Sequence, residues 1–166
     1  MDDVFQADYL RRDQVRQAYP LVRVHGPAVT LNHWLAFACH WTRMPERRGG
    51  LVAIKDVRGY LHALFSYRIE TDLCRGRLMR VSDLIVGHLA GKAIHMATMK
   101  AIERLADETG CSSVVIELEL SPIVPSDITT PNVFANAGFA PCAVSFFRQE
   151  SAYLRPRVVA SALLFD

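Results

Sequence analysis

One stretch, residues 78–110, constrains the fold of this chain more than any other. It begins with an apolar, β-branched run from Leu78 to Val86, continues through a short glycine-containing segment, and ends in a long amphipathic segment before Gly110. In that last segment apolar side chains recur at helical spacing, and charged side chains fall mostly on the opposite face. We therefore predict a buried strand, a tight turn and a long helix, with Gly110 as a left-handed C-cap.

A strand–turn–helix unit of this kind suits an anion. The first amides of a helix have no partner within the helix, and the helix dipole adds about half a positive charge at the same end. Our first hypothesis is therefore a phosphate site at the start of the helix. The run from Val114 to Leu120 then has the composition of an interior strand. Strand, helix and strand together predict a parallel pair with a right-handed crossover.

Two further helices are predicted in the first quarter of the chain. The first covers residues 10–19 and ends before Pro20, because proline disfavours helical geometry in the residue that precedes it; residues 22–24 begin a second short element. The second covers residues 31–41, with Thr30 as its N-cap. Its two His-Trp pairs, at 33–34 and 40–41, repeat seven residues apart and lie on one side. Core or interface packing is favoured over a metal site, since no third ligand can be named.

A β region follows. Residues 51–54 and 60–67 flank a turn that contains Gly59, and a second turn at residues 75–77 leads into the strand from Leu78. Three antiparallel strands therefore precede the crossover helix. Prolines exclude regular structure from 121 to 131.

Towards the end of the chain we expect a short helix at 132–137 closed by Gly138, then a last strand at 139–147. The tail, residues 151–166, is apolar enough to pack. If it is exposed it favours a homodimer.

Composition narrows the class of protein. The chain has 166 residues, 51% of them hydrophobic, which suits one domain covering residues 1–166. A net charge of +2 is too small to indicate nucleic-acid binding, so the local arginine clusters are interpreted as solvated faces. The four cysteines are scattered singly, without the spacing of a zinc or dithiol site. With no signal peptide and no apolar run of about 20 residues, we expect a cytoplasmic protein without a membrane partner or a metal.

The order of the predicted elements and two sequence motifs together resemble a known family. Residues 90–95 read Ala-Gly-Lys-Ala-Ile-His at the start of the long helix, and residues 133–139 read Val-Phe-Ala-Asn-Ala-Gly-Phe. The chain thus resembles the GCN5-related N-acetyltransferase (GNAT) superfamily, most specifically from Leu78 to Phe147, as a divergent member. The resemblance implies an α/β fold with a mixed central sheet, flanking helices and a strand–turn–helix site for acetyl-CoA.

The resemblance also implies a set of site residues. In that family, amides of the turn hold the pyrophosphate of acetyl-CoA and the preceding strand pairs with its pantetheine arm. Here the cofactor-binding positions are Leu84, Ile85, Val86, Ala90, Gly91, Lys92, Ala93, Ile94, His95 and Phe134. Three of them depart from the family pattern: Ala90 replaces arginine or glutamine, His95 replaces a small residue, and Phe134 lacks the hydroxyl of the usual tyrosine. His95 either narrows the phosphate cradle or bonds a phosphate.

Asp83 is the candidate catalytic base. It lies on the central strand directly before the pantetheine positions, where partial burial favours a proton-accepting role. The other interpretation is a strand carboxylate that pairs with Arg80 or Arg68. Glu117 and Glu119 are weaker candidates, because alternating glutamates usually mark the wetter face of a strand.

Three functions remain open at this point. The first is an N-acyltransferase that moves the acetyl group of acetyl-CoA to an amine of a small molecule or a protein. The second is a GNAT-fold protein without catalysis that serves as a binding or dimerisation module, to which the residues at 90, 95 and 134 point. The third is an unrelated α/β protein whose strand–turn–helix is only structural.

Overall fold

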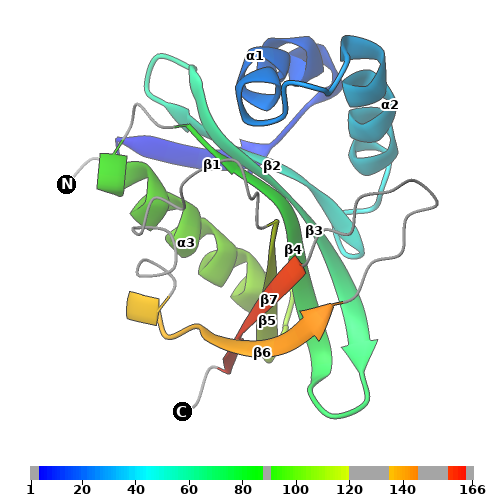
Figure 1. Cartoon of the computed structure of the whole chain (residues 1–166), viewed down its shortest axis with the longest axis vertical. Helices are drawn as coiled ribbons and strands as arrows, with labels where there is room; N and C mark the ends of the chain where they lie inside the picture. Colours follow the sequence, from blue (N-terminus) through cyan, green and yellow to red (C-terminus); the bar gives the residue numbers. More distant parts are fainter. Residues whose placement is uncertain (1–3, 88–90, 120–134, 146–156, 164–166) are drawn as a thin grey trace.

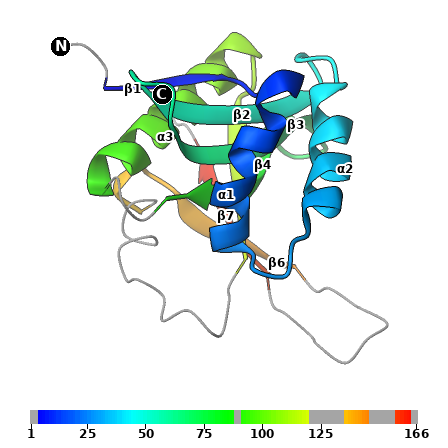
Figure 2. The ribbon, with the colours of Figure 1, turned by 90° about the horizontal axis from the view of Figure 1, so that it is seen from above.

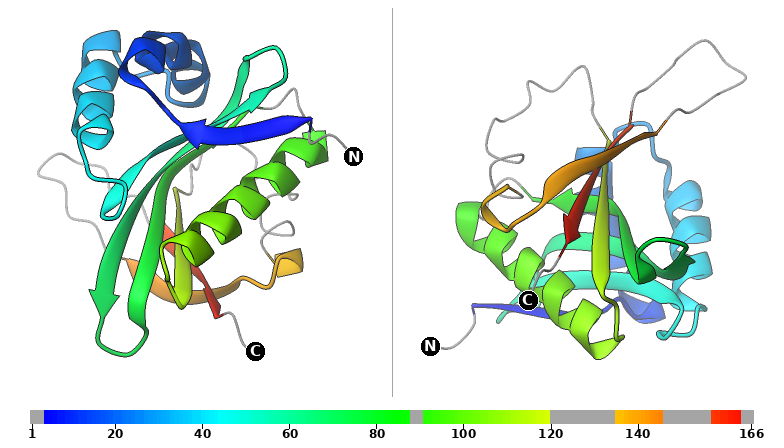
Figure 3. Two further views of the ribbon diagram at one scale, coloured as in Figure 1. Left: turned by 180° about the vertical axis from the view of Figure 1, so that it is seen from behind. Right: turned by 90° about the horizontal axis from the view of Figure 1, so that it is seen from below.

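A mixed β-sheet forms the centre of the molecule (Figure 1). The computed structural model describes residues 4–87, 91–119, 135–145 and 157–163. Within these residues, seven strands form one sheet in the order β1-β2-β3-β4-β5-β7-β6. Helices α1 and α2 lie beside each other and cover one face of the sheet (Figure 2), and α3 crosses the other (Figures 1 and 3). The predicted α/β class, with a mixed sheet and flanking helices, is confirmed.

The elements have the following bounds. The strands are β1 (Phe5–Tyr9), β2 (Gly49–Asp56), β3 (Leu61–Asp72), β4 (Gly76–Val86), β5 (Ser113–Glu119), β6 (Ala140–Ser145) and β7 (Arg157–Leu163). The helices are α1 (Val15–His25), α2 (Leu31–Thr42), α3 (Gly91–Glu108) and a 3-10 turn, η1 (Arg12–Gln14). Strands β4 and β5 are parallel, as the strand–helix–strand pattern predicts, and the other pairs are antiparallel.

Local signals placed several boundaries correctly. The Thr30 side chain accepts a hydrogen bond of 3.2 Å from the backbone N–H of His33, which makes it the predicted N-cap of α2. Gly110 follows α3 with a φ of 66°, the left-handed conformation that a C-cap requires. Gly59 likewise has a φ of 85° in the β2–β3 turn, so the predicted hairpin is confirmed.

The core has two layers, one on each face of the sheet. Alternate residues of the central strands face opposite layers, so Leu51 and Ala53 pack with α1 and α2, whereas Val52 and Ile54 pack with α3. Trp34 and Trp41 are buried in the first layer, so core packing is confirmed for the two tryptophans, whereas His33 and His40 are exposed. Among the described residues no cluster of three or more potential metal ligands is found. The described helices also include none that is long and apolar enough to cross a membrane.

Two predictions for the N-terminal part were wrong. Helix α1 begins at Val15 and runs through Pro20 to His25, so proline does not end it and residues 22–24 belong to the same helix. Burial of Val15, Ala18 and Val22 on one face outweighs the proline penalty of about 3 kcal/mol. The second error is strand β1, which was not predicted and which extends the sheet beyond β2, so four antiparallel strands precede α3.

The C-terminal part differs in strand order. The predicted last strand corresponds to β6, but β7 follows it and inserts between β5 and β6 (Figure 1). The apolar tail thus supplies a sheet strand in residues 157–163, and the homodimer stays a prediction. The proline-rich segment and the start of the short helix lie outside the described residues. Residues 135–136 are helical, and Gly138 follows with a φ of 82°.

Candidate active site

A β-bulge in β4 shapes the centre of the site. Leu64 pairs with Ile85 and Ser66 with Ser82, so two residues of β4, Asp83 and Leu84, lie opposite one residue of β3. Asp83 has a φ of 51°, and no other described residue except glycines has a positive φ. The bulge reverses the alternation of the strand, since Ile85 packs with the α1 and α2 layer. As a result, Ser82 and Asp83 line the same cavity.

Immediately before the bulge, β4 parts from its parallel neighbour. The two strands pair only from Leu78 to Val81 on β4 and from Ser113 to Ile116 on β5, although both continue further. Within the described residues, positions 82–86 of β4 therefore pair with β3 on one side and with no strand on the other. Unpaired strand backbone is able to form hydrogen bonds with an extended ligand. Leu84, Ile85 and Val86, the predicted pantetheine positions, lie in this segment.

A cavity of about 230 Å³ opens beside this segment, on the face covered by α1 and α2. Its lining comes from α2 and three neighbouring strands, and most of it is charged or polar. The lining residues are Trp41, Arg68, Glu70, Arg80, Ser82, Asp83, Glu117 and Leu118. Asp83 accepts a hydrogen bond of 2.6 Å from the Ser66 hydroxyl at its Oδ2 atom. Asp83 is nevertheless exposed, so the partial burial predicted from the sequence was wrong.

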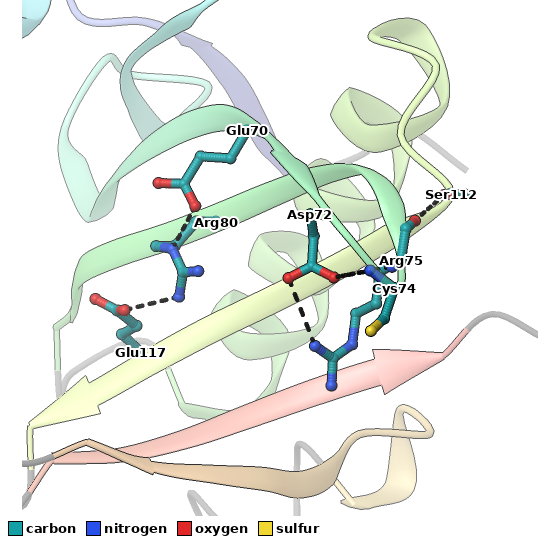
Figure 4. A network of polar contacts seen from close by, with 7 residues as sticks. All are labelled: Glu70, Asp72, Cys74, Arg75, Arg80, Ser112 and Glu117. Carbon is teal, nitrogen blue, oxygen red and sulfur yellow. Dashed lines mark hydrogen bonds and ion pairs between the residues drawn. The ribbon is translucent and has the colours of Figure 1, made fainter.

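Arg80 is held between two carboxylates (Figure 4). Its Nε atom lies 2.9 Å from Glu70 on β3, and another guanidinium nitrogen lies 2.9 Å from Glu117 on β5. Ser82 also donates a hydrogen bond of 3.1 Å to Glu117. Partial burial works to lower the pKa of Arg80, but the hydrogen bonds and charges of the two glutamates raise it overall. Arg80 thus links three strands beside the point where β4 and β5 cease to pair.

Figure 4 also shows the tip of the β3–β4 hairpin. There the Asp72 carboxylate accepts backbone hydrogen bonds from Arg75, at 2.8 Å, and from Cys74, at 2.9 Å. These bonds lower the pKa of Asp72. The hairpin that carries Glu70 and Arg80 is therefore closed by its own side chains.

Arg68 has a different environment. Its guanidinium carbon lies 5.5 Å from the centroid of the Trp41 ring, a cation–π arrangement. In the described part of the chain no carboxylate lies within 4.0 Å of it. The cavity therefore has one arginine bonded to two carboxylates and a second arginine that is stacked on an aromatic ring.

The predicted phosphate positions lie at the start of α3. Gly91 has a φ of 59°, the side chains of Lys92 and Ala93 are exposed, and Ile94 is buried in the core. The imidazole of His95 turns back along the helix, with Nδ1 3.0 Å from the backbone oxygen of Gly91. A carbonyl oxygen only accepts hydrogen bonds, so Nδ1 is the donor. Ala90 and Phe134 lie outside the described residues.

The structure brings together residues that sequence analysis treated separately. Asp83 and Glu117 line one cavity. The side chain of Glu119 lies outside the part of the chain that the structure describes. Arg80 pairs with Glu70 and Glu117, whereas sequence analysis had named it as a possible partner of Asp83.

Sequence analysis also missed several residues of the site. Trp41, Arg68, Glu70 and Ser82 line the cavity but were not predicted. The period-two spacing of polar residues at 68 and 70 and at 80 and 82 was the available signal for three of them.

Other polar and aromatic residues belong to the core or the hairpin. Tyr67 and Trp34 are buried in the two layers, and for Trp34 this confirms the predicted packing. His62 lies 3.1 Å from Asp56 and makes an edge contact with Phe5.

Solved structures provide the comparison for this geometry. A probable acetyltransferase from Staphylococcus epidermidis has a TM-score of 0.72 at 9% identity, with 97% of this chain and 99% of that one covered. For an acetyltransferase of the GNAT family from Streptococcus pneumoniae the TM-score is 0.64 at 9% identity, with 96% and 99% covered. For spermidine N-acetyltransferase from Vibrio cholerae, in complex with CoA and spermine, it is 0.69 at 10% identity, with 98% and 96% covered.

No protein-family model and no curated protein matches the sequence. The likeness is therefore one of fold, and it extends over nearly the whole chain. The chain has the fold of the GNAT acetyltransferases, which confirms the resemblance at the level of the fold.

Proposed function

We propose that the protein is an N-acyltransferase that transfers the acetyl group of acetyl-CoA to an amine. The observation that carries the proposal is the end of β4–β5 pairing at Val81, immediately before the bulge at Asp83. Because β5 no longer pairs with β4 there, backbone groups of β4 are left to form hydrogen bonds with the amides of the pantetheine arm. This backbone lies next to the carboxylate of Asp83, which lines the cavity. A fold shared with acetyltransferases, one of them in complex with CoA, supports the same function.

Each part of the site has a role in this reaction. The amine nitrogen forms a bond to the acetyl carbon, the carbon–sulfur bond breaks, and its electron pair leaves on the CoA sulfur. A backbone N–H of residues 84–86 polarises the thioester oxygen, as in an oxyanion hole. Asp83 accepts the proton that the nitrogen loses, directly or through a water molecule. Exposed Lys92 and the first amides of α3 stabilise the phosphates.

The first test is calorimetric titration with acetyl-CoA and with CoA, after a check that no CoA co-purifies. We expect micromolar binding, followed by release of free thiol when an amine is added. Binding without thiol release from any amine of a broad panel would contradict the proposal and favour a binding module. Absence of binding would exclude the acyltransferase, and would mean that the turn at residues 88–95 does not accept the cofactor.

A further inference from the structure

The cavity beside Asp83 is lined by two arginines and three carboxylates. Arg80 is bonded to both Glu70 and Glu117, each at 2.9 Å, so its single positive charge is shared by two carboxylates. Asp83 and Arg68 also line the cavity. Asp83 has the Ser66 hydroxyl as its hydrogen-bond donor, and the Arg68 guanidinium rests on Trp41.

Arg68 is prepared to bind an anion. Its guanidinium carbon lies over the indole ring, 5.5 Å from the ring centroid, and the N–H groups of a guanidinium suit a planar acceptor such as a carboxylate. Trp41 is only 8% exposed, so the aromatic support is itself fixed in the core. In contrast, the Nε and one terminal nitrogen of Arg80 already donate to glutamates.

The two groups lie on one face of β3. Ser66, which holds Asp83, and Arg68 are two residues apart on this strand, so their side chains project to the same side and their Cα atoms are about 7 Å apart. A separation of this size suits a substrate whose amine and anionic group are a few bonds from each other. The cavity volume of about 230 Å³ also favours a small molecule, since pockets for drug-sized ligands start at roughly 300 Å³.

From this juxtaposition we infer that the acceptor is a small amine that also carries a carboxylate, as an amino acid does. Arg68 binds the carboxylate, and Asp83 faces the amine. The inference rests on the proposed function for its chemistry, but the binding of a carboxylated amine does not require turnover. It separates this chain from an acceptor such as a polyamine, which has no carboxylate for Arg68 to bind.

Matched pairs of amines test the inference. Methionine, phenylalanine and leucine are compared with 3-(methylthio)propylamine, phenethylamine and isoamylamine, and spermidine is included. Binding is measured by calorimetry in the presence of CoA, and turnover by thiol release from acetyl-CoA. We expect at least one carboxylated amine to bind and react about ten- to a hundredfold better than its partner, the range of a charge-assisted hydrogen-bond pair. A preference for the uncarboxylated partners or for spermidine would overturn the inference.

Variants at Arg68 identify the group responsible. Arg68→Gln should remove most of the preference for the carboxylated amine through a higher Kd and KM, and Arg68→Lys should restore part of it. Arg58→Gln, an exposed arginine of the β2–β3 turn, is the matched control and should keep the preference. An equal loss for both members of each pair in Arg68→Gln would contradict the inference. Arg68-dependent binding without thiol release from any amine would support the anion site and contradict the acyltransferase proposal.

Discussion

The hydroxyl of Ser66 on β3 lies 2.6 Å from the Oδ2 atom of Asp83, which is in the bulge of the neighbouring strand β4. Ser66 is fully buried and also lies 3.2 Å from the backbone oxygen of Ser82, so its position is set by the sheet. The contact holds the candidate base against a rigid strand. The candidate base is therefore positioned by core structure and not by a loop.

The first prediction concerns this contact. Ser66→Ala removes the hydrogen bond that orients Asp83 and should lower kcat about tenfold, the effect of about 1.4 kcal/mol in the barrier, with little change in KM for acetyl-CoA. Steady-state thiol release measures both constants. Ser112→Ala, which removes an exposed hydroxyl remote from the cavity, is the control. An unchanged kcat in Ser66→Ala would show that Asp83 does not need this donor.

A second prediction separates the backbone of Asp83 from its carboxylate. Asparagine also tolerates the left-handed conformation that a φ of 51° requires, so Asp83→Asn should fold with wild-type stability and lose at least about a hundredfold in kcat. Asp83→Val should in addition destabilise the protein by about 1–3 kcal/mol, because a β-branched residue is strained there. Thermal unfolding and thiol release are the measurements. Full activity in Asp83→Asn would exclude Asp83 as the base.

Arg80 gives a prediction about coupling. Arg80→Met leaves Glu70 and Glu117 on adjacent strands without their shared cation and should lower the free energy of unfolding by about 1–3 kcal/mol. Adding Glu117→Gln to this variant should recover part of the loss, since one of the two like charges is then removed. Urea unfolding of the four proteins of this cycle measures the coupling. Strict additivity would mean that the ion pair contributes nothing to stability.

Tyr67 predicts how stability depends on pH. Burial, followed by the hydrogen bond with Tyr9 at 3.0 Å, raises the pKa of Tyr67 above its ordinary value of 10.0. A raised pKa means that the folded protein keeps a proton that the unfolded chain has lost. Its contribution is therefore complete below pH 10 and decreases above it, by up to about 1.4 kcal/mol per pH unit.

Tyr67→Phe provides the check. It should cost about 1–2 kcal/mol near neutral pH, because the 2.7 Å hydrogen bond to the Glu46 carbonyl is lost, and it should flatten the alkaline decline. Chemical unfolding from pH 8 to 11 measures both effects, with Tyr60→Phe as the exposed control. A wild-type slope in Tyr67→Phe would assign the decline to other groups.

Lys92 tests the phosphate end of the site. Lys92→Met should weaken acetyl-CoA binding about three- to tenfold at low ionic strength, and the difference should shrink as salt is added. Lys100→Met is the matched control, since this exposed lysine lies eight residues along α3, about 12 Å from the helix start. Equal effects of the two substitutions would indicate only a general attraction between the helix and CoA.

Local sequence patterns determined a substantial part of this fold. Three local signals each act within one helix or one hairpin, so they can be recognised in the sequence without knowledge of tertiary contacts. They are the period of the apolar residues in α3, the Thr30 cap, and the glycines at 59 and 110. The crossover from β4 through α3 to a parallel β5 follows from the order of these elements. The place of Asp83 and of residues 84–86 on β4, ahead of the crossover, was therefore accessible from the sequence, and their roles in the site stay predictions.

Tertiary structure decided the rest. Packing of α1 against the sheet overrode Pro20, and β7 found its place between β5 and β6 only through long-range pairing. The bulge at Asp83, the two glutamates around Arg80 and the stacking of Arg68 on Trp41 join residues that are up to 37 positions apart. The sequence by itself determined the strand–turn–helix unit because local propensity and period specify it, whereas the composition of the cavity depended on strand register and helix packing, which no local pattern encodes.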